Sequence, residues 1–415
     1  MISPISVSPA NAGDKVRIQH IAKGLAQHHN VTFVSPIDDV SNPKEKKQKT
    51  YRETIIKKET SEGLFDVPVP IRPSTRIQQI RSLCARWPYH TALRYRPKIT
   101  QRVRQLMDEN EYDLVYCHLL QTLPYVTNAT IPIVLDQQNV DRLYWQRQTA
   151  NYSTRSAHYW LSRLNHMKTI RFETQILPQL SAIVSVSAEE RAETCLYADG
   201  KVPYLFVAPN GVDASHYKLG RKDRPQDKFV LGFLGSLALA SNQRAVFRLV
   251  EQILPAVQQQ LPYISISTLI IGRNPPQNLL NFAARHPEKQ ITVTGEVEDV
   301  LPYLHQVDIM ALPLQSGAGT KLRVLEAMAA GVCVVGSPIA LAGFDDFVDG
   351  KHVLLANNND DFVAAVCMLA NNVDLRYAMR HQAHDLVVER YNWDRITSQL
   401  ANDLSGMYRN IKLKE

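Results

Sequence analysis

Paired cysteines, long apolar runs and a strong surplus of one charge are all missing from this sequence. The five cysteines are scattered and form no C-x-x-C pair: Cys84, Cys117, Cys195, Cys333 and Cys367. This spacing favours a reducing compartment and argues against structural zinc. The formal net charge of +7 is too small to indicate a nucleic-acid partner.

Segments that would target or anchor the chain are not evident either. No apolar run reaches the roughly 18 residues that a transmembrane helix needs. The first residues, MISPISVSP, lack the basic start and the apolar core of a signal peptide. We therefore expect a cytoplasmic protein.

The length and composition indicate a soluble protein of two domains. Of its 415 residues, 45% are hydrophobic and 21% are charged, as is usual for globular proteins. The chain is too long for one compact core and suits two domains of about 200 residues each. The charged, proline-containing stretch 221–227 indicates a linker between them. The predicted division is 1–220, 221–392 and a final helical segment, 393–415.

One segment, 307–335, carries the clearest pattern of the chain. It reads VDIMALPLQSGAGTKLRVLEAMAAGVCVV, which is an apolar strand, a loop with Gly317 and Gly319, a helix and a second apolar strand. The helix is predicted at 321–330 and is ended by Gly331. Such a βαβ unit exposes backbone N–H groups at a helix start, where the helix dipole also favours negative charge. The segment therefore predicts a phosphate site.

Three polar residues near this loop are candidate ligands. Thr320 is predicted to be the N-cap of the helix, and Lys321 supplies a positive charge for phosphate. Glu326 lies further along, where a carboxylate can accept hydrogen bonds from sugar hydroxyls. Taken alone, a glycine pair before a helix is more often a simple tight turn, and Lys321 and Glu326 fit equally well as solvated helix residues.

The complete string favours the first interpretation, because GAGTKLRVLEAMAAGVCVV resembles the donor-site signature of glycosyltransferase family 4. A common form of that signature is G-x-G-x-[RK]-x-K-x-L-E-A-M-A-x-G-x-P-V-V. The resemblance implies the α/β architecture called GT-B, with two Rossmann-like doubly wound domains facing across a cleft. It also implies that the final helix, after YNW at 391–393, crosses back onto the N-terminal domain.

The resemblance further implies the residues that bind a nucleoside diphosphate sugar, the donor of this family. Glu326 is implied to hold the ribose, and the backbone at 295–297 to meet the base. The implied donor-binding residues are Gly13, Gly235, Gly295, Glu296, Val297, Gly317, Gly319, Thr320, Lys321, Leu322 and Glu326. The implied catalytic residues are His118, which takes the second histidine position of a strand-end H-x-H pattern, and Lys321.

The sequence also departs from the family pattern. Many members have a glutamate eight positions before Glu326, where this chain has Ala318, and Cys333 replaces the usual proline. Most members have an arginine and a lysine after the first strand of the C-terminal domain, where this chain reads GSLALASNQ. Lys321 is then the best remaining diphosphate ligand, followed by Arg244.

Members of the family usually have a hydrophobic strand that ends in a phrase like S-P-x-P-x-x-P-x-x-x-G-x-x-x-R. In this chain only two residues precede that phrase. Most of a central first strand is therefore expected to be missing, either because the start is misplaced or because the domain tolerates a short remnant. A helix is predicted at 16–28. Further strands are predicted at 31–35, 112–117, 131–136, 182–187, 229–235, 268–272 and 291–296, and one long helix at 141–177.

Residues 72–104 form a basic segment with aromatic residues between the charges. A solvated helix face is the more frequent explanation for any one of these side chains. Together they could form a cationic surface that touches anionic lipid.

The predicted function is transfer of a hexose-type sugar from a nucleoside diphosphate to a hydroxyl of a glycan or lipid-linked acceptor. No D-x-D motif is present, so neither a metal nor another cofactor is expected. Retention of the anomeric configuration is what the family implies. Two alternatives remain: a nucleotide-sugar epimerase or phosphorylase of related fold, and a non-catalytic nucleotide-binding relative.

Overall fold

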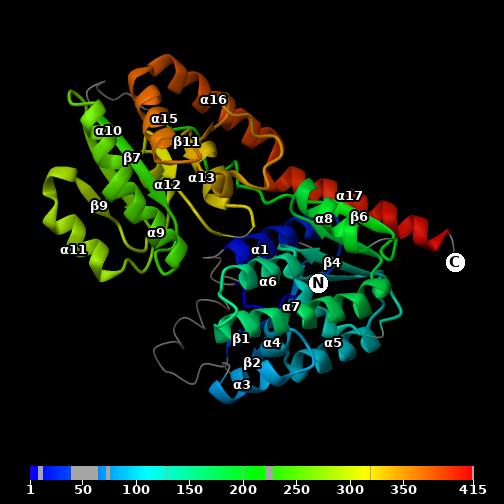
Figure 1. The fold of residues 1–415 in the computed structure, drawn as a ribbon. Coiled ribbons are helices and arrows are strands. Elements are labelled where there is room, and N and C mark those ends of the chain that lie inside the picture. The colour runs from blue at the N-terminus through cyan, green and yellow to red at the C-terminus, as the bar shows by residue number, and fades with distance from the viewer. Residues whose placement is uncertain are drawn as a thin grey trace. The chain divides into compact units, whose positions relative to one another are not determined.

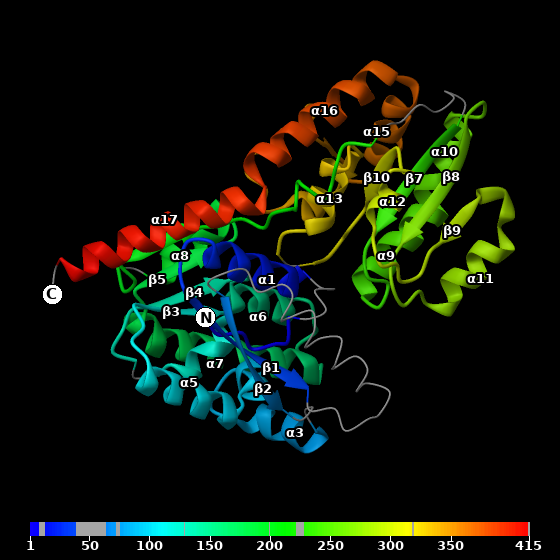
Figure 2. The same ribbon diagram turned by 180° about the vertical axis from the view of Figure 1, so that it is seen from behind.

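The computed structural model describes residues 1–7, 13–38, 64–71, 75–127, 129–198, 200–220, 228–317 and 319–413. They form two compact units, Met1–Pro209 with Asp394–Glu415, and Asn210–Trp393. We call them the N-terminal and C-terminal units. Each has its own parallel sheet covered by helices (Figures 1 and 2). The linker predicted at 221–227 lies outside the described residues.

The C-terminal unit has a six-stranded sheet in the order β12-β11-β10-β7-β8-β9, and every pair in it is parallel. The chain runs outward from β7 through β8 to β9, and then continues on the other side of β7 through β10, β11 and β12. This is the strand order of a doubly wound dinucleotide-binding fold. The strands are β7 (Lys228–Leu234), β8 (Ser265–Ile271), β9 (Ile291–Val293), β10 (Ile309–Leu312), β11 (Cys333–Gly336) and β12 (Leu354–Leu355).

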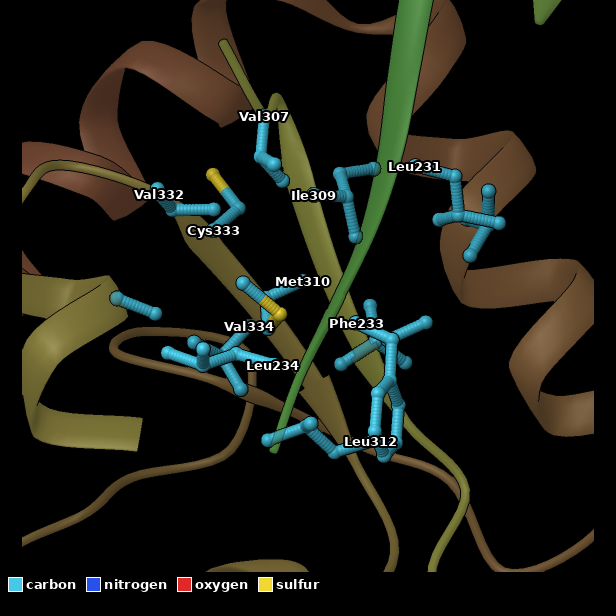
Figure 3. Packing of buried hydrophobic residues seen from close by; sticks show 14 of the residues in the cluster. Leu231, Phe233, Leu234, Val307, Ile309, Met310, Leu312, Val332, Cys333 and Val334 are labelled. Carbon is cyan, nitrogen blue, oxygen red and sulfur yellow. The ribbon is translucent and has the colours of Figure 1, made fainter. Parts of the chain in front are cut away.

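The core of this unit lies around β7, β10 and β11, whose side chains pack together in Figure 3. Leu231, Ile309 and Val334 are completely buried. Central strands of a parallel sheet are covered on both faces, so their sequences are continuous apolar runs. The covering helices are α9 (Ala240–Arg248), the π-helical turn η3 (Leu249–Ile253), α10 (Leu254–Gln260), α11 (Gln277–Arg285), α12 (Leu301–Leu304), α13 (Leu322–Ala329), α14 (Pro338–Leu341), α15 (Asn359–Asn371) and α16 (Val373–Arg390).

The N-terminal unit has two sets of parallel strands, β1-β2 and β3-β4-β5-β6. They are β1 (Val31–Asp38), β2 (Leu64–Ile71), β3 (Val115–His118), β4 (Ile133–Gln137), β5 (Ala182–Ser185) and β6 (Tyr204–Val207). Ile2 joins the two sets, because it forms parallel bridges to Val34 on β1 and to Cys117 on β3. A very short segment therefore occupies the central position of the expected first strand.

Helices complete the N-terminal unit: α1 (Gly13–Ala26), α3 (Arg76–Cys84), α4 (Tyr89–Arg94), α5 (Pro97–Glu109), α6 (Asp141–Ala150), α7 (Ala157–Ile176), α8 (Ala188–Ala198) and α17 (Trp393–Lys412). Most of α17 belongs to this unit, from Asp394 onwards. It packs closely against α1, since a Cβ on Gly24 would overlap the side chain of Thr397.

Two predicted helices differ from the observed ones. The single helix expected at 141–177 is wrong, because α6 ends at Ala150, with Asn151 as its C-cap, and α7 begins after Ser156, whose hydroxyl accepts a hydrogen bond from the His158 amide at 3.2 Å. Asparagine and serine are favoured at such ends because their side chains bond to nearby backbone groups. The helix expected at 16–28 begins earlier, at Gly13. None of the helices described is long and apolar enough to cross a bilayer.

Candidate functional site

The switch point of the C-terminal sheet lies between β7 and β10. These strands are adjacent, yet one leads on to β8 and the other to β11, toward opposite edges of the sheet. Open α/β sheets bind ligands beyond the carboxyl ends of strands at such a point. Gly235 directly follows β7, and the loop 313–321 follows β10 (Figure 3 shows the two strands). The predicted glycine loop therefore lies where this fold places a ligand.

The backbone of the loop requires its glycines. Gly317 has φ of 153° and Gly319 has φ of 66°, conformations that side chains with a Cβ rarely adopt. Gly331, after α13, has φ of 73°, as is typical of the residue that ends a helix. Ala318, which takes the place of the family's first glutamate, lies outside the described residues.

Helix α13 begins later than predicted, and Thr320 is not its N-cap. Lys321 takes that position, without a side-chain capping bond. The Thr320 hydroxyl instead accepts a hydrogen bond from the side-chain amide of Asn210, at 2.5 Å. Asn210 is 110 positions away from Thr320, so a partner distant in sequence has replaced the local cap.

The side chain of Lys321 lies over the glycine loop. Its ammonium group donates a hydrogen bond to the Gly319 carbonyl, and its Cε would be 3.3 Å from a Cβ built on Gly317. Leu322, the first residue of α13, is half-buried against the core. The charge therefore lies over the loop that leads into α13.

Arg323 is a second cation at the switch point, and the sequence analysis missed it. Its guanidinium donates to Asn242 Oδ1 at 3.2 Å and lies 5.8 Å from the ring centre of Phe233. A Cβ on Gly235 would overlap this guanidinium, so the glycine leaves room for it. Burial lowers the pKa of Arg323 to about 10, and the side chain stays charged at neutral pH. The lysine of the family form [RK]-x-K was the signal that could have identified it.

Arg244 approaches the same loop from α9. Its guanidinium donates a hydrogen bond to the Ser316 hydroxyl at 2.9 Å, and its side chain is exposed. Three cations, Lys321, Arg323 and Arg244, are therefore near the loop that follows β10. Such an arrangement can neutralise a bound diphosphate.

Glu326 is held by a residue that the sequence analysis did not single out. The Tyr217 hydroxyl donates a hydrogen bond to Glu326 Oε1 at 3.2 Å. Burial raises the pKa of Glu326, whereas this hydrogen bond and the nearby Arg323 act in the opposite direction. Burial and the carboxylate together raise the pKa of Tyr217, so its hydroxyl remains a donor.

Gly295, Glu296 and Val297 follow β9, at the edge of the sheet. Gly295 has φ of 73°, and its carbonyl accepts a hydrogen bond from the Thr294 hydroxyl at 2.9 Å. Glu296 is exposed, and Val297 packs against the core. The strands are parallel, so this turn lies at the same end of the sheet as the glycine loop.

His118 forms a buried charged cluster in the N-terminal unit. It is the last residue of β3, and its Nδ1 lies 2.9 Å from Oδ2 of Asp136, near the end of β4. Arg17 of α1 donates to the same carboxylate, with Nη2 to Oδ1 at 2.7 Å. Arg17 also donates to the carbonyl of Ala208 at 2.8 Å. All three side chains of the cluster are fully buried.

The charges of this cluster follow from its geometry. Burial lowers the pKa of His118, although Asp136 opposes that effect, so the ring is neutral. Burial alone would raise the pKa of Asp136, but Arg17 and His118 lower it. The carboxylate therefore accepts a hydrogen bond from Nδ1–H, which leaves Nε2 of His118 as an acceptor. This atom is buried and has no hydrogen-bond partner among the described residues.

Gly13 is the exposed first residue of α1, one turn before Arg17. His118 and Gly13 lie in the N-terminal unit, and the other predicted site residues lie in the C-terminal unit. In the part of the chain that the structure describes, no group of three or more His, Cys, Asp or Glu side chains could hold a metal ion.

Both halves of the chain match known protein families. Residues 13–216 match the profile described as Glycosyltransferase Family 4, and residues 228–372 match the one described as Glycosyl transferases group 1. The two matches support glycosyl transfer as the class of activity. No curated protein matches the chain by sequence.

Solved structures share the fold over the whole chain. Sucrose-phosphate synthase from Thermosynechococcus elongatus has a TM-score of 0.70 at 15% identity, covering 100% of this chain and 98% of that one. HepE from Anabaena, in complex with UDP and glucose, has a TM-score of 0.64 at 14% identity, covering 98% of each chain. A glycosyltransferase from Rickettsia africae has a TM-score of 0.64 at 12% identity, covering 99% and 98%. The predicted GT-B fold, with two Rossmann-like domains, is confirmed.

Proposed function

We propose that this GT-B glycosyltransferase moves a hexose-type sugar from a nucleoside diphosphate to a hydroxyl group of a glycan or lipid-linked acceptor. One observation carries the proposal: cations, free helix amides and a carboxylate gather at the switch point of the C-terminal sheet. The HepE structures contain UDP or UDP-glucose, which makes UDP-sugars the first donors to test.

The diphosphate is the leaving group, and its negative charge increases as the bond to the sugar breaks. Groups fixed in advance around that charge lower the barrier most effectively. Lys321, Arg323 and the amides at the start of α13 are suited to this role. We propose that they perform it without a metal ion, so activity should persist in a chelating buffer.

Glu326 is proposed to accept hydrogen bonds from the ribose hydroxyls, with Tyr217 positioning its carboxylate. His118 is proposed to contact the transferred sugar through Nε2, which the bond to Asp136 leaves as an acceptor. Retention of the anomeric configuration is part of the proposal, and NMR of the first product formed would establish it.

An assay of nucleoside diphosphate release tests the proposed activity. Release that depends on an added acceptor, with a glycosylated product, supports transfer. Conversion of the donor to another nucleotide sugar would instead support an epimerase, and binding without turnover a non-catalytic protein. A panel of donors in a thermal-shift assay would identify the nucleotide first, because a ligand at 100 times its Kd stabilises by about 2.7 kcal/mol.

Glu326→Gln is expected to weaken binding of the nucleoside diphosphate by about 1–3 kcal/mol, because a charged acceptor becomes a neutral one. Isothermal titration calorimetry measures the change. Tyr217→Phe should weaken binding less and chiefly at low pH, since loss of the hydroxyl raises the pKa of Glu326 and the carboxylate protonates sooner as pH falls. An unchanged Kd for Glu326→Gln would rule out the ribose assignment.

A further inference from the structure

Helix α7 of the N-terminal unit exposes large apolar side chains and buries polar ones, which is the reverse of an ordinary surface helix. Its buried face contains Ser162, Asn165, Thr169 and Glu173, together with Phe172 and Ile176. Its exposed face contains Trp160, Leu164 and Met167, with 58%, 45% and 61% of each residue exposed. Surface helices normally bury their apolar stripe and expose the polar one. Three large apolar side chains are thus in contact with solvent.

Hydrogen bonds of the buried polar residues of α7 fix this orientation, although Glu173 Oε1 has no partner among the described residues. Asn165 Oδ1 accepts a hydrogen bond from the Tyr89 amide of α4 at 2.9 Å, and the Thr169 hydroxyl donates to the Asn165 carbonyl at 2.9 Å. Glu173 accepts from Arg142 Nε at 2.8 Å. Rotation of the helix to hide Trp160 would break the bonds to Tyr89 and Arg142, which is costly for buried polar groups.

The exposed residues of α7 form one stripe. Trp160, Leu164, Met167 and Arg171 are spaced by four, three and four positions, which places them within roughly 60° of arc. Arg163 flanks them, with its guanidinium 5.9 Å from the ring centre of Trp160. We call these five residues the α7 stripe.

The surroundings of the stripe are basic and contain no acid over long stretches. Neither 67–107 nor 142–172 contains a single aspartate or glutamate, and both are rich in arginine. The two segments pack together, since Lys168 of α7 donates a hydrogen bond to the Leu83 carbonyl of α3 at 2.7 Å. The one acid near the end of α7, Glu173, is buried and paired, so it does not offset this charge.

Helix α3, whose Leu83 carbonyl accepts the hydrogen bond from Lys168, also exposes apolar and basic side chains. Ile77 and Ile80 are each 63% exposed, and Arg81 follows them on the exposed surface. Only some basic residues of the segment predicted at 72–104 belong to this exposed surface. Arg96, for example, donates hydrogen bonds to the carbonyls of Leu93 and Tyr95.

We infer that the α7 stripe, with the exposed face of α3, docks on the surface of an anionic lipid bilayer. Positive charge without acidic neighbours complements anionic headgroups. Exposed Trp, Leu, Met and Ile side chains fit the boundary between headgroups and acyl chains, where an amphipathic helix lies in the plane of the membrane. This inference goes beyond the proposed reaction and does not depend on it.

Flotation of the full-length protein with vesicles tests the docking. We expect binding to an equimolar mixture of phosphatidylcholine and phosphatidylglycerol, much weaker binding to phosphatidylcholine alone, and loss of binding as salt rises from about 0.05 to 0.5 M. Bromine-labelled acyl chains should quench the fluorescence of Trp160, and Trp160→Phe should abolish the quenching. Trp87, Trp145 and Trp393 are partly or fully buried and serve as an internal reference.

Matched substitutions show whether the stripe itself is responsible. Leu164→Ser with Met167→Ser should weaken binding to anionic vesicles at least tenfold, or about 1.4 kcal/mol. Leu196→Ser with Met368→Ser removes exposed side chains of the same types elsewhere and should leave binding within about twofold. Arg163→Glu with Arg171→Glu should also abolish it, whereas Arg285→Glu should not.

Three results would overturn the inference: equal binding to neutral and anionic vesicles, equal binding by the stripe variants and their controls, and no binding to either vesicle. A dimer seen by sedimentation velocity that Leu164→Ser dissociates, without vesicle binding, would assign the stripe to a second copy of the chain. All substituted side chains are exposed, so the variants should fold, and circular dichroism checks that they do.

Discussion

Asp136→Ala is expected to lower the free energy of unfolding by about 3–5 kcal/mol, the largest single effect that we anticipate on stability. Asp136 is the anion between Arg17 and His118, and all three side chains are fully buried. Without it, the buried guanidinium of Arg17 loses the carboxylate to which its Nε and Nη2 donate hydrogen bonds. Removing one partner of a buried ion pair is strongly destabilising, whereas an intact pair contributes little.

Urea denaturation followed by circular dichroism measures the loss. Asp113→Ala is the matched control, because Asp113 is an exposed aspartate of the same unit, and its change should stay within about 0.5 kcal/mol. A similar small change for Asp136→Ala would mean that the Arg17 charge finds another partner or reaches water.

The same cluster predicts how stability depends on pH. The pKa of Asp136 is lowered by folding, so its contribution is present above about pH 4 and is lost as pH falls through the folded value. The pKa of His118 is also lowered, so below about pH 6.5 the unfolded chain binds a proton that the folded chain does not. The contribution of this cluster to stability should therefore fall as pH drops from 7 to 5.

His118→Asn keeps a donor toward Asp136 but cannot titrate. Relative to the wild type, it should remove up to about 1.4 kcal/mol of this fall per pH unit, the effect of one proton. Unfolding free energies at pH 7, 6 and 5 give the comparison. Parallel curves for the two proteins would show that His118 titrates normally in the folded state.

Local sequence patterns predicted the parts of the structure that local forces decide. The apolar runs of β10 and β11 gave a buried parallel sheet, and Gly317 and Gly319 gave a loop that only glycine forms easily. Together with the family signature, these features were enough to predict the two Rossmann-like domains.

Contacts between distant residues could not be predicted in the same way. Arg17 and Asp136 are 119 positions apart, and Tyr217 and Glu326 are 109 apart. Thr320 had the side chain of an N-cap, but Asn210, 110 positions away, bonds its hydroxyl instead. In each case a residue distant in sequence determines what the side chain binds, and no periodicity in the sequence predicts that contact.

Helix α7 shows a different limit. Its apolar residues have helical spacing, and periodicity alone would place Trp160, Leu164 and Met167 in a core. The buried positions are instead held by Asn165 and its hydrogen bonds to α4. A pattern of apolar residues identifies a face of a helix, but it does not say whether protein or another medium covers that face.

Lys321→Ala is expected to lower turnover at least tenfold, or about 1.4 kcal/mol in activation free energy, with donor saturating. The arginine and lysine that most family members place after the first strand are missing, while the leaving diphosphate still needs positive charge. Lys321 lies over the glycine loop at the start of α13. A cation at a helix N-terminus opposes the helix dipole, so its position there depends on other contacts, such as the hydrogen bond to the Gly319 carbonyl. The contact between Lys321 and the diphosphate should strengthen in the transition state. Its loss should therefore lower kcat and not only the affinity for the donor.

Lys351→Ala, at an exposed lysine of the same unit, should leave turnover within about twofold and serves as the control. The Arg323→Gln variant tests whether Lys321 and Arg323 act together on the diphosphate. If both contact the same phosphates, the double variant should lose less than the sum of the single losses in free energy, because coupled sites are not additive. Strictly additive losses would mean that they act separately. Turnover of Lys321→Ala within about twofold of wild type would transfer the role to Arg323, whose guanidinium already lies at the switch point beside Asn242.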